Sequence, residues 1–196
     1  MKELLLIDCC VQGKESRTQK LTNAFLEGLD KQKFHVTTVS PEAEGMVPLT
    51  GANFARREAL VAEGALDHPR FYYAQQFAQA DVAVFAAPLW ELSFPAILKV
   101  YIENISVKGI TFGCDTDGLF GSCRGSRLIF LTTRGERYEN SELEQGSRYL
   151  EAMAKFFGFE SYSCIAADGL DAAGADPRII LADACGRARG LAASLS

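Results

Sequence analysis

Short apolar runs alternate along this chain with segments whose apolar residues recur every three or four positions. Short runs bounded by turn-forming residues are typical of buried strands, and the longer spacing is typical of a helix that buries one face. Five runs predict strands: Lys2–Asp8, Phe34–Val39, Asp81–Ala87, Leu128–Thr132 and Phe159–Ala166. The third is continuously apolar after its first residue, as expected of a central strand covered on both faces.

Four of the six predicted helices begin in the first half of the chain. The first buries a face formed by Leu21, Phe25, Leu26 and Leu29. The second, Asn53–Glu63, is charged and is expected to lie on the surface. Two more helices are predicted at Pro69–Gln79 and Pro95–Ile105. Residues 108–125 carry few periodic cues, so we expect a long loop, a feature that is often functional in compact domains.

The last two helices are predicted from their start signals. Ser141 and Glu144 have the spacing of a capping box, and Gly158 marks the end of the helix that follows. Asp176-Pro177 predicts the start of the final helix. The inward faces are expected to carry Leu143, Leu150, Met153 and Phe157 in the first case, and Ile180, Ala184 and Leu191 in the second.

Repeated alternation of strand and helix predicts an α/β fold, with a parallel sheet covered by helices on both faces. The 196 residues suit a single domain spanning 1–196. Ligands of such sheets bind beyond the carboxyl ends of the strands. Three loops leave predicted strands at that edge: Cys9–Thr18, Pro88–Phe94 and Thr132–Asn140.

The first of these loops has two interpretations. A strand, a loop rich in small and polar residues and a helix N-terminus together form a common phosphate site, to which Ser16 and Thr18 would add hydroxyl donors and Arg17 a cation. Alternatively, Ser16 and Gln19 form a capping box that only starts the helix. The glycine frameworks of the Walker A loop and of the Rossmann fingerprint are both absent.

The second and third loops favour a flat ligand attached to that phosphate. Trp90, the single tryptophan, directly follows a strand end and would pack against an aromatic ring, or simply cover the sheet end. The loop after Thr132 brings Gly135 and polar neighbours to the adjacent strand end, where backbone N–H groups would meet ring carbonyls or only form a turn. Taken together, the three loops predict FMN.

The composition indicates which kinds of partner and which cell compartment to expect. The net charge of -5 and the lack of a Lys/Arg block argue against nucleic acid. No segment resembles a signal peptide or a membrane span, which favours the cytoplasm. The six cysteines show no metal-ligand spacing with His35 or His68 and are expected to be thiols; a redox role for Cys9-Cys10 is a minor alternative.

Four motifs carry a resemblance to a known family: Glu15-Ser16-Arg17-Thr18, Ala87-Pro88-Leu89-Trp90 with Phe94-Pro95-Ala96-Ile97-Leu98-Lys99, Gly109-Ile110-Thr111-Phe112, and Thr132-Thr133-Arg134-Gly135. In this order and spacing the chain resembles the flavodoxin-like, FMN-dependent NAD(P)H oxidoreductases, which include azoreductases and quinone reductases. The resemblance implies a three-layer sandwich with a five-stranded parallel sheet in the order 2-1-3-4-5. It also implies a homodimer whose flavin sites lie at the subunit interface.

The resemblance further assigns residues to parts of the cofactor, and no metal. The phosphate positions are Cys10, Ser16, Arg17 and Thr18. The loop along the isoalloxazine ring is Pro88, Leu89, Trp90, Glu91 and Leu92. The loop at the polar edge of the ring is Thr133, Arg134, Gly135 and Glu136.

Three of these positions depart from the family pattern. Cys10 replaces a serine with a weaker donor, Glu91 replaces an asparagine and Glu136 replaces a second glycine. A carboxylate near the flavin would oppose its anionic reduced form.

The resemblance implies ping-pong transfer of a hydride from NAD(P)H to FMN and then to a quinone, azo compound or similar small acceptor. No side chain is required as an acid or base, so no residue is predicted to be catalytic. Two alternatives from other classes remain. One is a flavodoxin-type electron carrier that meets a protein partner, and the other is a flavin-free or regulatory binding protein suggested by Cys10, Glu91 and Glu136.

Overall fold

The computed structural model describes residues 1–195, with the backbone alone at position 14, and it contains one central parallel sheet. The strands lie in the order β2-β1-β3-β6-β7, and their bounds are β1 Lys2–Asp8, β2 Phe34–Val39, β3 Val82–Ala86, β6 Arg127–Thr133 and β7 Ser161–Ala167. All four neighbouring pairs are parallel. The five predicted strands and the order 2-1-3-4-5 are therefore confirmed: two strands have the predicted bounds and the ends of the other three differ by one or two residues.

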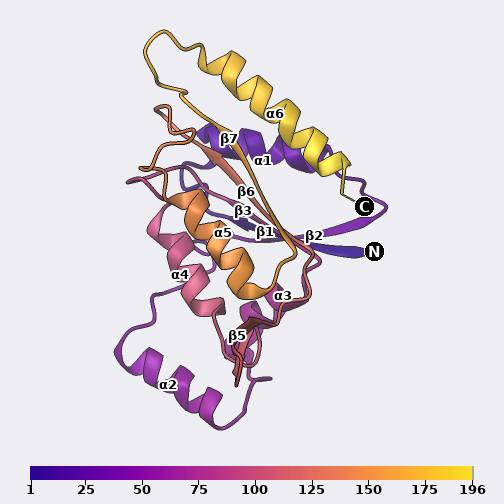
Figure 1. Ribbon diagram of the computed structural model, residues 1–196, viewed down its shortest axis with the longest axis vertical. Coiled ribbons are helices and arrows are strands. Elements are labelled where there is room, and N and C mark those ends of the chain that lie inside the picture. The colour runs from indigo at the N-terminus through magenta and orange to yellow at the C-terminus, as the bar shows by residue number, and fades with distance from the viewer. Residues whose placement is uncertain (196) are drawn as a thin grey trace.

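Helices cover both faces of this sheet (Figure 1). One face carries α1 Arg17–Glu27 and α6 Pro177–Ala193, and the other carries α3 Tyr72–Gln79, α4 Ala96–Ile105 and α5 Gly146–Phe157. Side chains alternate along each strand, so Leu4 and Leu6 of β1 face the first layer while Leu5 and Ile7 face the second. The predicted α/β sandwich is confirmed.

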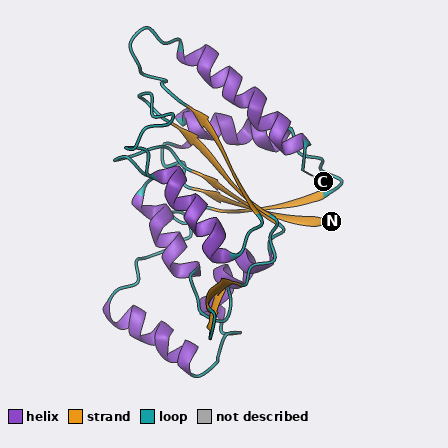
Figure 2. Cartoon of the chain, in the orientation of Figure 1, coloured by secondary structure: helices purple, strands orange, loops and turns teal. Residues whose placement is uncertain are grey.

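All five strands run in one direction, so their carboxyl ends meet at a single edge (Figure 2). The loops after β1, β3 and β6 emerge there, and these three strands are neighbours in the sheet. A short 3₁₀ helix, η1 Gly13–Glu15, lies in the first loop just before α1. The sheet order therefore places the three loops side by side.

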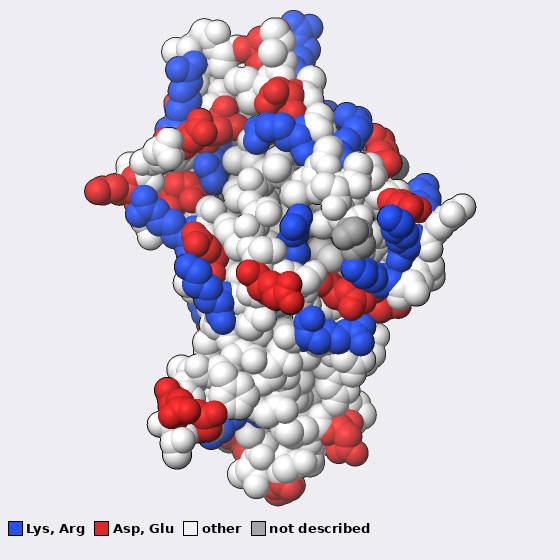
Figure 3. All heavy atoms as spheres, turned by 45° about the vertical axis from the view of Figure 1, so that its right-hand side comes forward, with Lys and Arg blue, Asp and Glu red and all other residues white. Residues whose placement is uncertain are grey.

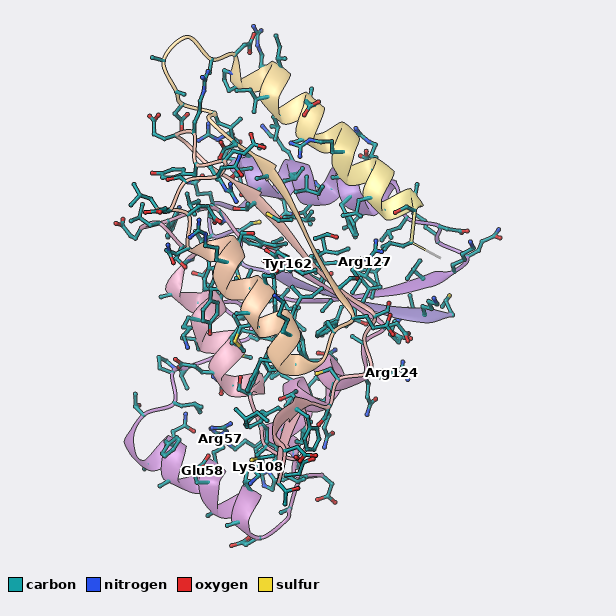
Figure 4. All side chains as sticks on the ribbon, in the orientation of Figure 1. Arg57, Glu58, Lys108, Arg124, Arg127 and Tyr162 are labelled. Atoms are coloured by element: carbon teal, nitrogen blue, oxygen red, sulfur yellow. The ribbon has the colours of Figure 1, made fainter. Side chains whose placement is uncertain are left out.

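Helix α2 Gly51–Ala62 lies away from the sheet and buries none of its residues, which confirms the predicted surface helix. Arg57 connects it to the rest of the molecule by donating from Nη2 to the carbonyl oxygen of Ser106, just after α4 (Figure 4). The next predicted helix, from Pro69, begins with a 3₁₀ turn, η2 Pro69–Phe71, before α3.

Residues 108–125 are not the long loop that the sequence predicts. They contain a β-hairpin of β4 Phe112–Asp115 and β5 Gly118–Gly121. The turn is closed by the Asp115 carboxylate, which accepts from the Asp117 N–H at 2.9 Å, and Gly118 adopts a φ of 121°. The two central residues of the turn are Thr116 and Asp117, which are not a typical pair for a two-residue hairpin turn, and the strands on either side are too short and too exposed to show alternation.

The predicted capping box at Ser141 and Glu144 is wrong. Helix α5 begins only at Gly146, and Ser141 Oγ accepts from the Leu143 N–H inside a turn. Glu144 itself caps the helix by accepting from the Ser147 N–H at 2.9 Å, while Leu143 is 57% exposed rather than inward-facing. By contrast, Gly158 ends α5 with a φ of 89° and the Asp176 carboxylate caps α6, both as predicted.

Within residues 1–195, no helix is long and apolar enough to cross a bilayer. The same residues contain no cluster of His, Cys, Asp and Glu side chains that would hold a metal ion. All six cysteines are free.

Candidate functional site

The three predicted loops are joined to one another at the carboxyl edge of the sheet. Thr18 Oγ1, at the start of α1, lies 2.6 Å from Thr133 Oγ1, at the end of β6. The Leu89 N–H, after β3, donates to the Thr133 carbonyl at 2.9 Å. Thr133 therefore ties the first loop to the second, and the structure brings the predicted phosphate, ring and polar-edge segments together.

The first loop ends in a well-formed helix start. Ser16 is the N-cap of α1 and its Oγ accepts from the Gln19 N–H at 3.2 Å, which confirms the cap. The reciprocal half of the predicted capping box does not form, because the Ser16 N–H donates to the Gly13 carbonyl and the Gln19 side chain donates to Asn23. A capping hydroxyl uses only its oxygen in this bond, and its proton remains able to donate. The N–H groups of Arg17 and Thr18 have no acceptor inside the helix and form the positive end of the helix dipole. The cap and the phosphate interpretations are thus compatible.

Cys10 and its neighbour Cys9 are poor candidates for reactive thiols. The Cys10 thiol is directed at the Ala86 carbonyl, 3.8 Å away, and its backbone N–H donates to the Asp8 carboxylate. Burial raises the pKa of both thiols well above its ordinary value, and the Asp8 carboxylate adds to the shift. Both cysteines are therefore protonated at neutral pH, and a thiolate is needed for nucleophilic or redox chemistry.

Arg17 makes a contact that the sequence did not predict. Its Nη1 and Nη2 donate to the two carboxylate oxygens of Asp171 at 2.7 and 2.8 Å. This bond holds the pKa of Asp171 below its ordinary value and raises the pKa of Arg17. Asp171 lies in the loop between β7 and α6, where neither periodicity nor motif marks it, because its only signal is proximity in the folded chain.

The second loop forms a tight two-residue turn with a strained backbone. Trp90 and Ser93 exchange N–H···O bonds of 3.2 and 2.8 Å, and the two residues between them have positive φ values of 47° for Glu91 and 66° for Leu92. Positive φ at two consecutive non-glycine residues costs roughly 1–2 kcal/mol each. The turn holds Trp90 43% exposed and Leu92 38% exposed at the edge of the sheet. Half-buried Pro88 and Leu89 lie just before it.

The third loop presents backbone donors toward the same edge. Its carbonyls at Arg134, Gly135 and Glu136 accept from Leu170, Asp171 and Gly169, at 3.0, 2.8 and 3.1 Å. Within the described part of the chain, by contrast, the N–H groups of Gly135 and Glu136 have no acceptor. An added Cβ at Gly135 would lie 3.0 Å from the Asp171 carboxylate, so a side chain there would crowd the Arg17 ion pair.

The Arg134 side chain leaves the edge that the sequence assigns to it. It is only 6% exposed, and its guanidinium lies 3.4 Å from both the Glu144 and the Asp168 carboxylates. Asp168 also accepts from the Tyr138 and Glu139 N–H groups, at 2.9 and 3.1 Å. The Arg134 side chain therefore stabilises the third loop through buried ion pairs, and only the Arg134 backbone lies at the predicted site. Sequence reasoning missed both of its carboxylate partners.

The largest cavity described, about 900 Å³, lies beside β7 and shares only Arg134 with the predicted residues. It is lined by side chains of both charges, including Glu144, Asp168 and Arg187. This cavity is therefore separate from most of the candidate site.

The chemistry of the donors at this edge fits FMN. A hydroxyl proton, a helix N-terminus and a cation lie at one end, which is the donor set of a phosphate site. Exposed apolar side chains and unpaired amide donors lie at the other, which suits a flat ring with polar carbonyls. The buried Thr18–Thr133 contact fixes the two ends relative to each other.

Comparison with known proteins agrees with this geometry. A family model described as a flavodoxin-like fold matches residues 2–189. An FMN-dependent NADH:quinone oxidoreductase of Clostridium perfringens is 36% identical over 177 residues, and one of Clostridium acetobutylicum is 38% identical over 179 residues; each match covers 89% of both chains. The structure of an FMN-dependent NADH-azoreductase from Bacillus anthracis, in complex with FMN, has a TM-score of 0.85 at 24% identity over 98% of both chains. The chain therefore belongs to the flavodoxin-like fold family.

Proposed function

We propose that this chain is an FMN-dependent NADH:quinone oxidoreductase, which passes two electrons as a hydride from NADH to a quinone. The observation that carries the proposal is an identity of 36% and 38% with relatives of that name, over 89% of the chain. The donor set at the carboxyl edge supports it. Azo compounds are a second class of acceptor, as in the name of the azoreductase from B. anthracis.

The start of α1 would hold the FMN phosphate. Ser16 would donate its hydroxyl proton, Arg17 would supply a positive charge, and the N–H groups of Arg17 and Thr18 would donate from the helix end. The Thr18 hydroxyl is shared with Thr133, so its role is to fix the loop. Cys10 would border the phosphate without bonding to it, since its thiol is directed at Ala86.

The second and third loops would hold the flavin ring, and the bound flavin would supply the two-electron chemistry. Pro88, Leu89, Trp90 and Leu92 offer apolar surface for the ring, with Glu91 at the turn. The N–H groups of Gly135 and Glu136 would donate to ring carbonyls. The carboxylates of Glu91 and Glu136 are exposed, so water screens their charge from the ring. We assign no side chain as a proton donor or acceptor.

Two measurements test this function. The purified chain, titrated with FMN, should bind it and acquire a shifted flavin absorption spectrum. Stopped-flow mixing of the loaded protein with NADH should then bleach the flavin, and added quinone should restore the colour. A protein that takes up no FMN would instead be a flavin-free binding protein, and one that binds FMN but is not reduced by NADH would be an electron carrier.

We also propose that the active form is a homodimer in the cytoplasm, with the flavin sites at the subunit interface. Several apolar side chains are exposed, among them Phe54 of α2 at 48% and Leu119 of the hairpin at 67%. The lower part of the view in Figure 3 has a broad uncharged centre with acidic side chains at its margins, whereas positive and negative side chains are mixed over the rest of that view. Sedimentation equilibrium should give twice the chain mass of 21.4 kDa.

A further inference from the structure

The ion pair of Arg17 and Asp171 has a specific geometry. The guanidinium meets the carboxylate end-on, with Nη1 on one oxygen at 2.7 Å and Nη2 on the other at 2.8 Å. A guanidinium carries five N–H groups in one plane, and end-on pairing uses one hydrogen of each Nη. The Nε–H and the outer Nη hydrogens are left over, and Nε has no partner in the described part of the chain. The Nε–H and the Nη hydrogen beside it form a free edge of the guanidinium, which can bind a second anion in bidentate fashion.

The carboxylate is held more firmly than the arginine. The Asp171 N–H donates to the Gly135 carbonyl at 2.8 Å, and the two residues before it bond to Glu136 and Arg134. Backbone bonds thus fix the Asp171 loop without help from the ion pair. Arg17, by contrast, is a long side chain, 38% exposed, that would sample many rotamers alone. The position of the Arg17 side chain therefore depends on Asp171, and the position of Asp171 does not depend on Arg17.

The pair also lies between the two ends of the candidate site. Arg17 is the first residue of α1, directly after the capping Ser16, while Asp171 is bonded to the third loop at Gly135. A guanidinium fixed here keeps its free edge close to the start of α1, of which Arg17 is the first residue. Holding a flexible cation in place before the ligand arrives reduces the entropy lost on binding.

We propose that Asp171 is a positioning residue for the cofactor phosphate: it grips one edge of the Arg17 guanidinium so that the other edge binds phosphate oxygens. This rests on the proposed function, since it concerns the same site. It predicts that Asp171 matters for ligands that carry the phosphate and not for the flavin ring alone.

The test compares dissociation constants for FMN and for riboflavin, which lacks the phosphate, by absorbance titration of the purified protein. Asp171→Asn should raise the FMN dissociation constant about three- to tenfold and change that of riboflavin less than about twofold. Arg17→Ala should do the same, and the double variant should lose no more than Arg17→Ala alone, because the two residues act as one unit. Glu27→Gln, which breaks a similarly exposed ion pair with Arg189, should leave both constants unchanged.

The outcomes separate the alternatives. An unchanged FMN constant in Asp171→Asn overturns the proposal, and a lower one shows that Asp171 competes with the phosphate for Arg17. Equal losses for FMN and riboflavin overturn it as well, since they indicate a general loosening of the loops. If the parent binds no FMN at all, the proposed function itself fails and this proposal with it; parent binding with normal Asp171→Asn binding refutes the positioning role alone.

Discussion

Arg134 shows how the fold decides the role of a single residue. Its place after a strand end suggested a side chain at the ligand edge, yet its guanidinium is buried between Glu144 and Asp168. Burying a charge is tolerable only when it is paired, and here one cation is shared by two carboxylates. Its Nε has no partner, so the arrangement is held by charge more than by a full set of hydrogen bonds. Removing the cation would leave Glu144, only 6% exposed, without its counter-charge.

Arg134→Met should therefore lower the free energy of unfolding by about 3–5 kcal/mol, the usual cost of breaking a buried ion pair from one side. Urea denaturation of the FMN-free protein measures it. Arg189→Met is the matched control, because its ion pair with Glu27 is exposed, and its loss should be about 1 kcal/mol or less. Similar losses in the two variants would show that the Arg134 charge is not needed for the fold.

At the scale of elements, the hairpin is joined to α5 by two glycines in close contact. A Cβ added to Gly121, at the end of β5, would lie 2.0 Å from the Gly158 nitrogen, at the end of α5. Gly158 has a φ of 89°, a backbone conformation that residues other than glycine rarely adopt. Nearby, the Cys123 N–H donates to the Phe157 carbonyl at 3.0 Å. At this contact the hairpin packs on the helix end through backbone atoms, with no room for a side chain at Gly121, and the rings of Phe112 and Phe156 also pack together with centroids 4.7 Å apart.

Gly121→Ala should destabilise the protein by roughly 1–3 kcal/mol, because the added methyl group forces the two backbones apart. Gly186→Ala is the contrasting substitution: Gly186 lies inside α6 with no atom within 4 Å of its would-be Cβ. There alanine should stabilise by about 0.5–1 kcal/mol through its better helix propensity. Thermal unfolding followed by circular dichroism compares the two, and a neutral Gly121→Ala would mean that the hairpin is free to shift.

At the scale of the whole molecule, several cysteine thiols and tyrosine hydroxyls are buried. Burial raises the pKa of Cys9, Cys10, Tyr101 and Tyr162 above its ordinary value, and raises the pKa of Cys123 to about 12. In the unfolded chain these groups lose their protons at lower pH than in the folded one. The stability that they contribute is complete below the unfolded pKa of 9.0 for thiols and is lost as the pH rises toward the folded value.

We therefore expect the free energy of unfolding to fall between pH 8 and pH 10. The Cys123 thiol should account for roughly 1 kcal/mol of that fall, so Cys123→Ala should show a shallower decrease than the parent. Urea titrations at both pH values, with a reductant present, measure the difference. Cys114→Ala, which removes an exposed thiol, should keep the decrease of the parent. Identical decreases in Cys123→Ala and the parent would contradict the assignment.

The amino-acid sequence by itself determined the alternation of strands and helices, the parallel sheet and the three loops at its carboxyl edge. It could do so because these features follow from local periodicity and from cap residues such as Ser16 and Asp176. The sequence did not reveal the hairpin, because its exposed four-residue strands hide the pattern.

Only the tertiary structure decided which side chains face the candidate site. Arg17 finds its partner 154 positions away in Asp171, and Arg134 turns from the edge to a carboxylate 34 positions away in Asp168. Glu144 caps α5 while pairing with Arg134, which shifts the helix start beyond the predicted capping box. The Arg17–Asp171 and Arg134–Asp168 contacts join segments that no local pattern relates. The physical reason is that ion pairs form between charged groups that packing brings close in space. The sequence shows only how far apart these groups are along the chain.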